Sequence, residues 1–297
     1  IASDASALVG HTKRAIYLND GEVAKLTKNS IEVKTLNSEP VSAKVEEIET
    51  NLAAIQKGGY EHFLLKEIME QPNSLRETLR GRVNLANDTV HLGGPGLSEA
   101  ELRKIKHLII VGCGTAYHAG LLAGYYIEQF TPEITIETVI ASEYRYRQAY
   151  IPEDTVALIV SQSGETADTL ACIKKVKEYG AKTLGIVNVA GSSITRRAQY
   201  VIQTQAGPEI GVAATKTYVS QLTAIYLFAA LMAKDDELLN DLDNVPDFID
   251  EVLEDVESIK AMSQRYNYAK DFFYLGRGYS YPTALEGALK LKEISYI

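Results

Sequence analysis

The sequence has few cysteines, no long apolar run and no excess of positive charge. Its two cysteines, Cys113 and Cys172, both stand in apolar surroundings, which favours buried free thiols in a reducing compartment over a disulfide. No apolar run approaches the roughly 20 residues that a membrane span needs, and there is no basic-then-apolar leader. A net charge of −9 argues against nucleic acid or an anionic membrane as the main partner. We therefore expect a cytoplasmic protein.

Two nucleotide-binding signatures are also missing. The glycine turn Gly112-Cys113-Gly114 lacks a third glycine, and no acidic residue closes the next predicted strand near Ala141. This pattern disfavours a nicotinamide site. No Gly-Lys-Ser/Thr phosphate loop occurs either, which argues against hydrolysis of nucleoside triphosphates. We expect neither a metal ion nor an organic cofactor.

What the chain does contain is an alternation of apolar runs and helical patterns. Its 297 residues, 46% hydrophobic and 23% charged, are typical of a globular protein that can hold two domains. Helices are expected at 115–130, 142–149, 166–179, 192–198 and 214–233, and strands at 107–111, 134–140, 156–160, 182–187 and 200–204. This order predicts an α/β fold with a doubly wound, five-stranded parallel sheet covered on both faces.

The regions on either side of this sheet follow other patterns. Residues 1–40 contain short strand patterns around the turn Asn19-Asp20-Gly21, too few for an independent domain. Helices are expected at 44–57 and at 61–79, the second broken near Pro72, and a loop is expected at 87–96. An exposed acidic boundary is expected at 235–243 and a helix at 246–269. The strand expected at 272–275, the glycines after it and the helix expected from Pro282 then resemble the beginning of a second copy of the sheet domain.

Four parts are therefore predicted: 1–40, the end of an N-terminal domain; 41–100, a helical connector; 101–240, the sheet domain; and 246–297, a truncated repeat. The chain begins with Ile1, and its last predicted helix has no Gly, Asn or Pro terminator. We expect it to be a piece of a longer protein.

The turn from Ser161 to Thr166 joins a buried strand to the start of a helix, where unpaired backbone N–H groups and the helix dipole favour an anion. The turn that ends in Thr115 closes the first strand. In the common doubly wound order the first and third strands are neighbours, so both turns should form one crevice. An alternative is that their hydroxyl groups only cap their own helices.

Three charged residues share one face of the last predicted helix. Glu286, Lys290 and Glu293 stand at positions i, i+4 and i+7, so a carboxylate and an ammonium could transfer a proton beside a carbonyl group. From spacing alone, a solvated salt-bridged stripe is the favoured interpretation. His118 is expected in the core or at the rim, and 209–216 is expected to form a shaped loop near the crevice.

Five stretches together resemble the glutamine–fructose-6-phosphate aminotransferase (glucosamine-6-phosphate synthase) family: 112–115, 141–147, 161–169, 209–213 and 284–296. The resemblance covers essentially the whole chain. It implies an N-terminal-nucleophile glutaminase domain ending within 1–40 and two sugar-isomerase domains of flavodoxin-like fold. It also implies the first step of amino-sugar synthesis, in which ammonia from glutamine and fructose 6-phosphate give glucosamine 6-phosphate. The implied partners are these two substrates, the glutamine through the glutaminase domain, and a second copy in a homodimer.

The resemblance also implies roles for individual residues. Glu293 matches the base that moves a proton between C1 and C2 of the sugar, and Lys290 matches a lysine of the same site. Substrate contacts are implied for seven residues: Thr115, Ala116, Ser161, Gln162, Ser163, Thr166 and Val212. For the last helix, these implied roles replace the interpretation as a solvated salt-bridged stripe.

The chain departs from the family pattern in several places. The family usually has Ser where this chain has Ala116, so one phosphate contact is expected to be lost or taken over by a backbone N–H. The nucleophilic Cys, the ring-opening His and the Schiff-base Lys are not in this chain, so the piece alone is expected not to complete the reaction. Two alternatives stay open: a non-catalytic sugar-phosphate sensor, and an isomerase without amination, against which the β-rich residues 1–40 argue.

Overall fold

The computed structural model describes residues 1–2, 7–48, 56–84, 89–90, 92, 97–102, 104–233 and 236–297. Contacts divide the chain into two compact units, Ile1–Gly59 and Tyr60–Ile297, which are described separately below. Most of the loop expected at 87–96 and part of the helix expected at 44–57 lie outside the described residues. The four-part domain division stays a prediction.

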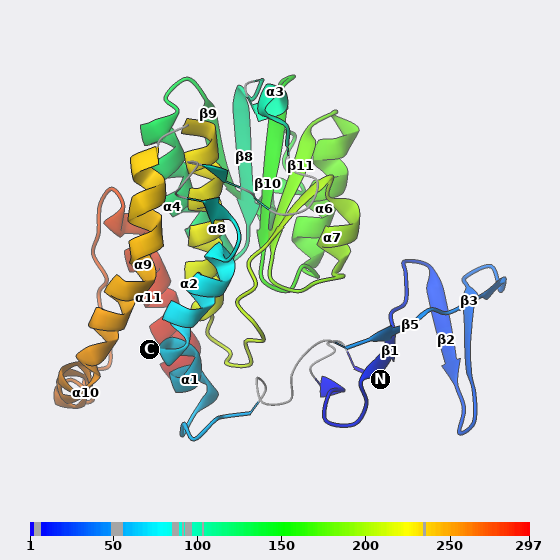
Figure 1. Ribbon diagram of the computed structural model, residues 1–297, viewed down its shortest axis with the longest axis horizontal. Coiled ribbons are helices and arrows are strands. Elements are labelled where there is room, and N and C mark those ends of the chain that lie inside the picture. Colours follow the sequence, from blue (N-terminus) through cyan, green and yellow to red (C-terminus); the bar gives the residue numbers. More distant parts are fainter. Residues whose placement is uncertain are drawn as a thin grey trace. The chain divides into compact units, whose positions relative to one another are not determined.

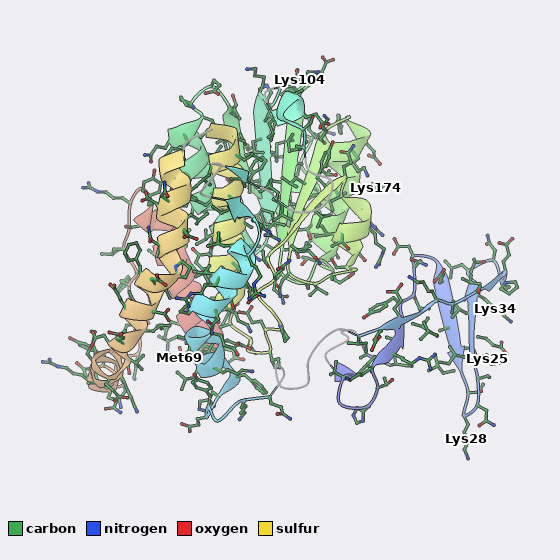
Figure 2. All side chains as sticks on the ribbon, in the orientation of Figure 1. Lys25, Lys28, Lys34, Met69, Lys104 and Lys174 are labelled. Atoms are coloured by element: carbon green, nitrogen blue, oxygen red, sulfur yellow. The ribbon has the colours of Figure 1, made fainter. Side chains whose placement is uncertain are left out.

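The first unit consists of short antiparallel strands (Figure 1). These are β1 (Arg14–Ile16), β2 (Glu22–Leu26), β3 (Ile31–Thr35), β4 (Pro40–Val41) and β5 (Val45–Glu47). β2, β3 and β4 form one sheet, while β1 pairs with β5. The side chains of Lys25, Lys28 and Lys34 extend outward from the β2–β3 hairpin (Figure 2).

The prediction of a helix beginning at residue 44 is wrong for residues 45–47, which the structure describes. Val45–Glu47 is a strand that pairs antiparallel with Arg14–Ile16, Val45 lying opposite Ile16. The helical pattern was a local signal, and the ladder with β1 supplies hydrogen bonds that no local signal reveals.

The second unit contains the predicted five-stranded parallel sheet. Its strands are β8 (His107–Gly112), β9 (Thr135–Ile140), β10 (Thr155–Ser161), β11 (Lys182–Val187) and β12 (Tyr200–Gln203). They lie in the order β12-β11-β10-β8-β9, so the first and third strands are neighbours, as expected. Successive residues of β8 face opposite sides, with Leu108 and Ile110 in one core and Ile109 and Val111 in the other.

Helices cover both faces of this sheet (Figure 1). On one face lie α4 (Thr115–Phe130) and α8 (Lys216–Ala233). On the other lie α5 (Ala141–Tyr144), α6 (Ala167–Glu178) and α7 (Ser193–Arg197). The helices that follow β8 and β10 are thus on opposite faces, which is the arrangement that opens a crevice between their starts.

Shorter elements precede the sheet within the second unit. They are α1 (Phe63–Met69), α2 (Gln71–Leu79), β6 (Val83–Asn84), β7 (Thr89–Val90) and α3 (Glu99–Leu102). The break expected near Pro72 is confirmed, because α2 begins at Gln71 with the proline in its first turn. α2 packs against α8 and α9.

The C-terminal part of the unit is helical: α9 (Asp236–Glu254), α10 (Val256–Arg265) and α11 (Ser280–Ser295). The boundary expected at 235–243 is not exposed throughout, because Leu238, Leu239 and Leu242 are buried there on one face of an amphipathic helix. The strand expected at 272–275 is also wrong. Those residues form no strand, since no described strand offers them a hydrogen-bonding partner.

No described helix combines the length and hydrophobicity required to cross a lipid bilayer.

Candidate functional site

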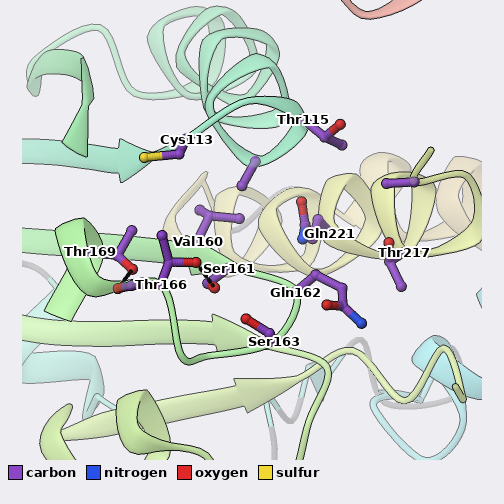
Figure 3. A pocket seen from close by; sticks show the side chains of 12 residues that line it. Cys113, Thr115, Val160, Ser161, Gln162, Ser163, Thr166, Thr169, Thr217 and Gln221 are labelled. Atoms are coloured by element: carbon purple, nitrogen blue, oxygen red, sulfur yellow. Dashed lines mark hydrogen bonds between the residues drawn. The ribbon is translucent and has the colours of Figure 1, made fainter. Parts of the chain in front are cut away.

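A pocket of about 190 Å³ opens where β8 and β10 end. Its walls come from three places: the start of α4, the turn after β10, and the first half of α8 (Figure 3). It is lined by Cys113, Thr115, Ala116, Val160, Ser161, Gln162, Ser163, Thr166, Thr169, Ala214, Thr217 and Gln221. None of these side chains is charged, and six of them carry a hydroxyl group.

The turn after β10 has a fixed shape that directs its side chains. Gly164 has φ +68°, and a Cβ there would overlap the Ser192 side chain, so only glycine fits. The backbone N–H of Gly164 donates to Ser161 Oγ at 3.1 Å, and the N–H of Glu165 donates to Ser163 Oγ at 3.2 Å. Both serine oxygens therefore accept a bond from the turn itself, which leaves their hydroxyl protons available to a ligand.

The other pocket hydroxyls differ in their availability. Thr166 Oγ1 lies 3.3 Å from Ser161 Oγ, an exchangeable contact within the turn. Thr169 donates to the carbonyl oxygen of Thr166, and Thr217 bonds to the Glu209 carboxylate. The hydroxyls free for an anion are thus concentrated on the turn.

Glycines also determine how closely α4 approaches the end of β8. A Cβ on Gly112 would lie 2.7 Å from the Ala116 carbonyl carbon, and Gly114 has φ +54°. This close approach places Thr115 and Ala116 on the pocket wall.

The alternative that these hydroxyls only cap their own helices is wrong. Thr166, the N-cap of α6, makes no side-chain capping hydrogen bond, and the N-cap of α4 is Gly114, which has no side chain to cap with. The positive ends of both helix dipoles therefore face the pocket without a side-chain cap, while the nearby carboxylates of Asp168 and Glu286 are paired with Arg145 and with Thr115, His118 and Lys290. The acidic residue of the turn, Glu165, instead accepts the Ser193 N–H at the start of α7. The arrangement suits a small anion held by hydroxyls and dipoles rather than by cations.

A buried charged cluster lies next to the pocket and joins α4 to α11. Thr115 Oγ1 donates to Glu286 Oε1 at 2.8 Å, and His118 Nδ1 lies 2.7 Å from Glu286 Oε2. Lys290 Nζ lies 3.1 Å from Glu286 Oε1 and 2.8 Å from Glu293 Oε2, and it donates to Thr115 Oγ1 at 2.9 Å. Glu286 is only 5% exposed, so the solvated-stripe alternative is wrong for this residue.

The pKa of Glu286 reflects two opposing effects. Burial raises it, but the hydrogen bonds from His118 and Thr115 and the charge of Lys290 together hold the pKa below its ordinary value of 4.5. The carboxylate is therefore ionised and orients two groups, Thr115 on the pocket wall and Lys290 beside it.

The loop before α8 is held by the buried carboxylate of Glu67 and by its own residue Glu209. Glu67 on α1 accepts the N–H groups of Ile210 and Gly211 at 2.6 and 3.0 Å. Glu209 accepts the N–H of Thr215 at 2.8 Å and so caps the start of α8. Ala214 reaches the pocket from this loop.

The structure brings most of the predicted site residues together, but not all of them. Six of the predicted substrate contacts line this pocket: Thr115, Ala116, Ser161, Gln162, Ser163 and Thr166. Lys290 and Glu293 lie behind Thr115 and do not line it. Val212 is 84% exposed and is also absent from the lining.

Thr217 and Gln221 line the pocket but were missed from the sequence. The available signal was their i, i+4 spacing, which places two polar side chains on one face of an otherwise apolar helix.

The chain is similar to known proteins over the segment that forms this site. Residues 101–231, which span the sheet and most of α8, match the SIS domain family. Across its full length the chain is 45% identical to a glutamine–fructose-6-phosphate aminotransferase [isomerizing] of Chlorobaculum tepidum and 46% identical to that of Methanothermobacter thermautotrophicus. It covers 50% and 48% of these proteins, so the chain spans about half the length of the curated relatives it matches.

Among solved structures, the C-terminal domain of glucosamine-fructose-6-phosphate aminotransferase from Francisella tularensis is 37% identical, with a TM-score of 0.76. The match covers 82% of this chain and 70% of that one.

Proposed function

Because this chain belongs to the glutamine–fructose-6-phosphate aminotransferase family, we propose that its pocket binds fructose 6-phosphate. In the complete protein, we propose, this site converts that ketose phosphate to glucosamine 6-phosphate with ammonia from glutamine. The observation that carries the proposal is the uncharged, hydroxyl-rich pocket at two uncapped helix starts. Such a site suits the phosphate group of a small molecule.

The phosphate is assigned to the turn after β10. Ser161, Ser163 and Thr166 supply hydroxyl donors, and the start of α6 supplies the dipole. Ala116 has no hydroxyl, so the start of α4 contributes only its backbone and dipole beside Thr115.

The chemistry is assigned to the last helix. Glu293 is the base that moves a proton between C1 and C2, and Lys290, 2.8 Å from its carboxylate, positions it. Lys290 also reaches Thr115, which links this pair to the pocket wall. An acid–base pair beside the pocket favours an enzyme over a non-catalytic sugar-phosphate sensor.

Replacing the two serines tests the phosphate assignment. Each lost hydrogen bond to a charged phosphate should cost about 1.5–3 kcal/mol, so Ser161→Ala with Ser163→Ala should weaken fructose 6-phosphate binding by at least about a hundredfold. Isothermal titration calorimetry measures the affinity, and Ser263→Ala, on the exposed face of α10, is the control. Unchanged affinity in the double variant would remove the phosphate from this turn.

Replacing the proposed base separates binding from chemistry. Glu293→Gln keeps the shape of the side chain but cannot accept the proton, so the complete enzyme should bind fructose 6-phosphate and fail to isomerise it. Exchange of the C1 and C2 protons with solvent, followed by NMR, reports the step. Continued exchange at the wild-type rate would exclude Glu293 as the base.

A further inference from the structure

Gln221 is a buried polar side chain whose carbonyl oxygen has no partner among the described residues. It lies on α8, is 2% exposed and lines the pocket between the start of α4 and the turn after β10 (Figure 3). A buried acceptor without a partner costs about 1–3 kcal/mol, so such groups in native proteins call for an explanation. The cavity in front of it supplies one, because a ligand there would provide the missing bond.

The neighbouring polar groups show why Gln221 differs from them. Thr115 bonds to Glu286 and Lys290, and Thr217 bonds to Glu209, so these two pocket hydroxyls already have protein partners. Ser220 is equally buried and also lacks a partner, but it does not line the pocket. A serine hydroxyl can rotate toward a carbonyl of its own helix, whereas the longer amide of Gln221 cannot.

The chemistry of an amide selects the ligand group. A carbonyl oxygen needs a donor, and the oxygens of a sugar-phosphate dianion carry no proton and only accept, so the phosphate group of a sugar phosphate does not satisfy it. A sugar hydroxyl both donates and accepts and can pair with the oxygen and the nitrogen of the amide. The turn at 161–166 and α8 form different walls of the same pocket, so the carbon chain of a sugar phosphate anchored on the turn can reach Gln221.

We propose that Gln221 is a specificity residue that binds a hydroxyl group of the sugar while the turn at 161–166 holds the phosphate. This inference rests on the proposed function and goes beyond it, because it names the residue that distinguishes a polyhydroxy phosphate from phosphate alone.

Two ligands and three variants test the inference. Affinities for fructose 6-phosphate and for inorganic phosphate are measured by calorimetry on wild type, Gln221→Leu and Ser220→Ala. Gln221→Leu should weaken fructose 6-phosphate binding about five- to tenfold, the value of one hydrogen bond, and leave phosphate binding unchanged within about twofold. Ser220→Ala should leave both affinities unchanged. The double variant Ser161→Ala with Ser163→Ala should weaken both ligands together.

Thermal unfolding without ligand gives a second readout. Leucine removes an unsatisfied acceptor at nearly constant volume, so unliganded Gln221→Leu should unfold at or above the wild-type temperature. A lower unfolding temperature would mean that the amide has a structural partner and would overturn the inference. So would a Gln221→Leu variant that binds fructose 6-phosphate as wild type does, or that loses both ligands equally. If wild type binds phosphate but not fructose 6-phosphate, the proposed function itself fails, and this inference fails with it.

Discussion

A single carboxylate, Glu286, sets the geometry behind the pocket. It is almost fully buried and bonds to Thr115, His118 and Lys290, so its charge is balanced within the protein. Two of these partners belong to α4 and one to α11, so the same residue also joins the two helices. Buried ion pairs of this kind contribute positioning more reliably than they contribute net stability.

Glu286→Gln should lower the stability of the protein at neutral pH and make that stability less dependent on pH in the acid range. A pKa held below 4.5 means that the carboxylate contributes stability above that pH and loses it as pH falls through the lowered value. Wild type should therefore lose stability on acidification more steeply than the glutamine variant. At neutral pH the variant should be about 1–3 kcal/mol less stable, because its amide cannot satisfy all three partners. Urea unfolding at several pH values measures both effects.

The control for this prediction is Glu257→Gln, an exposed carboxyl group on α10. If Glu286→Gln and wild type show parallel stability curves below pH 4.5, the native ionisation inferred for Glu286 is wrong.

At the scale of elements, Glu67 on α1 and Glu70 just after it hold the loop between β12 and α8 in place; these two residues are called the clamp below. Glu67 accepts two backbone N–H groups of that loop, and Glu70 pairs with Lys216, the buried first residue of α8, at 2.7 Å. A Cβ on Gly211 would overlap the Glu67 carboxylate, so the contact also requires glycine. A helix that precedes the sheet by many residues therefore fixes one rim of the pocket.

Glu67→Ala should loosen this loop selectively. The N–H groups of Ile210 and Gly211 would lose their acceptor, and their hydrogen exchange should accelerate while the amides of β8 and β10 keep their protection. Fructose 6-phosphate affinity should fall, because Ala214 on the pocket wall belongs to the same loop. Exchange followed by mass spectrometry, with the exposed Glu178→Ala as control, measures the effect. Unchanged exchange at 210–211 would show that the loop holds its shape without the clamp.

These elements also show what the sequence could and could not predict. The sheet order and the two pocket walls at the ends of β8 and β10 followed from local patterns, because parallel strands need helical crossovers and these turns lie at strand ends. The clamp could not be predicted, since nothing near Glu67 in sequence indicates that its partners are the backbone N–H groups of Ile210 and Gly211. The strand at 45–47 was missed for the same reason, because its pairing with β1 is a long-range contact.

At the C-terminal end, the pattern at 272–275 predicted a strand that the structure does not form. Strand propensity alone does not make a strand without a neighbour to pair with. Gln221 shows the corresponding limit for the site, since a polar residue inside an apolar helix is recognisable, but the cavity beside it is not.

At the scale of the whole chain, the two compact units differ in how much core each contains. The hydrophobic clusters of the described residues all lie within Tyr60–Ile297, whereas Val9, Val33 and Ile48 are the buried hydrophobic residues described for Ile1–Gly59. A unit of that size with so small a core is marginal by itself.

Residues 60–297 should consequently fold without residues 1–59. The excised unit should show one cooperative unfolding transition at the temperature of the full chain and bind fructose 6-phosphate with the same affinity. Circular dichroism and calorimetry on both proteins test this expectation. A large drop in unfolding temperature on removal of 1–59 would mean that the smaller unit stabilises the sheet domain.

The two uncapped helix starts at the pocket have a consequence for mutational tolerance. Their attraction for anions comes from backbone N–H groups and aligned peptide dipoles, which no side-chain substitution removes. Side chains around the pocket outside the turn at 161–166 can therefore vary without removing this attraction. Random mutagenesis of those positions should change which sugar phosphate is preferred more readily than it abolishes phosphate binding, whereas loss of the Ser161 and Ser163 hydroxyls should weaken that binding. The backbone thus supplies the part of the proposed phosphate site that does not depend on the identity of its side chains.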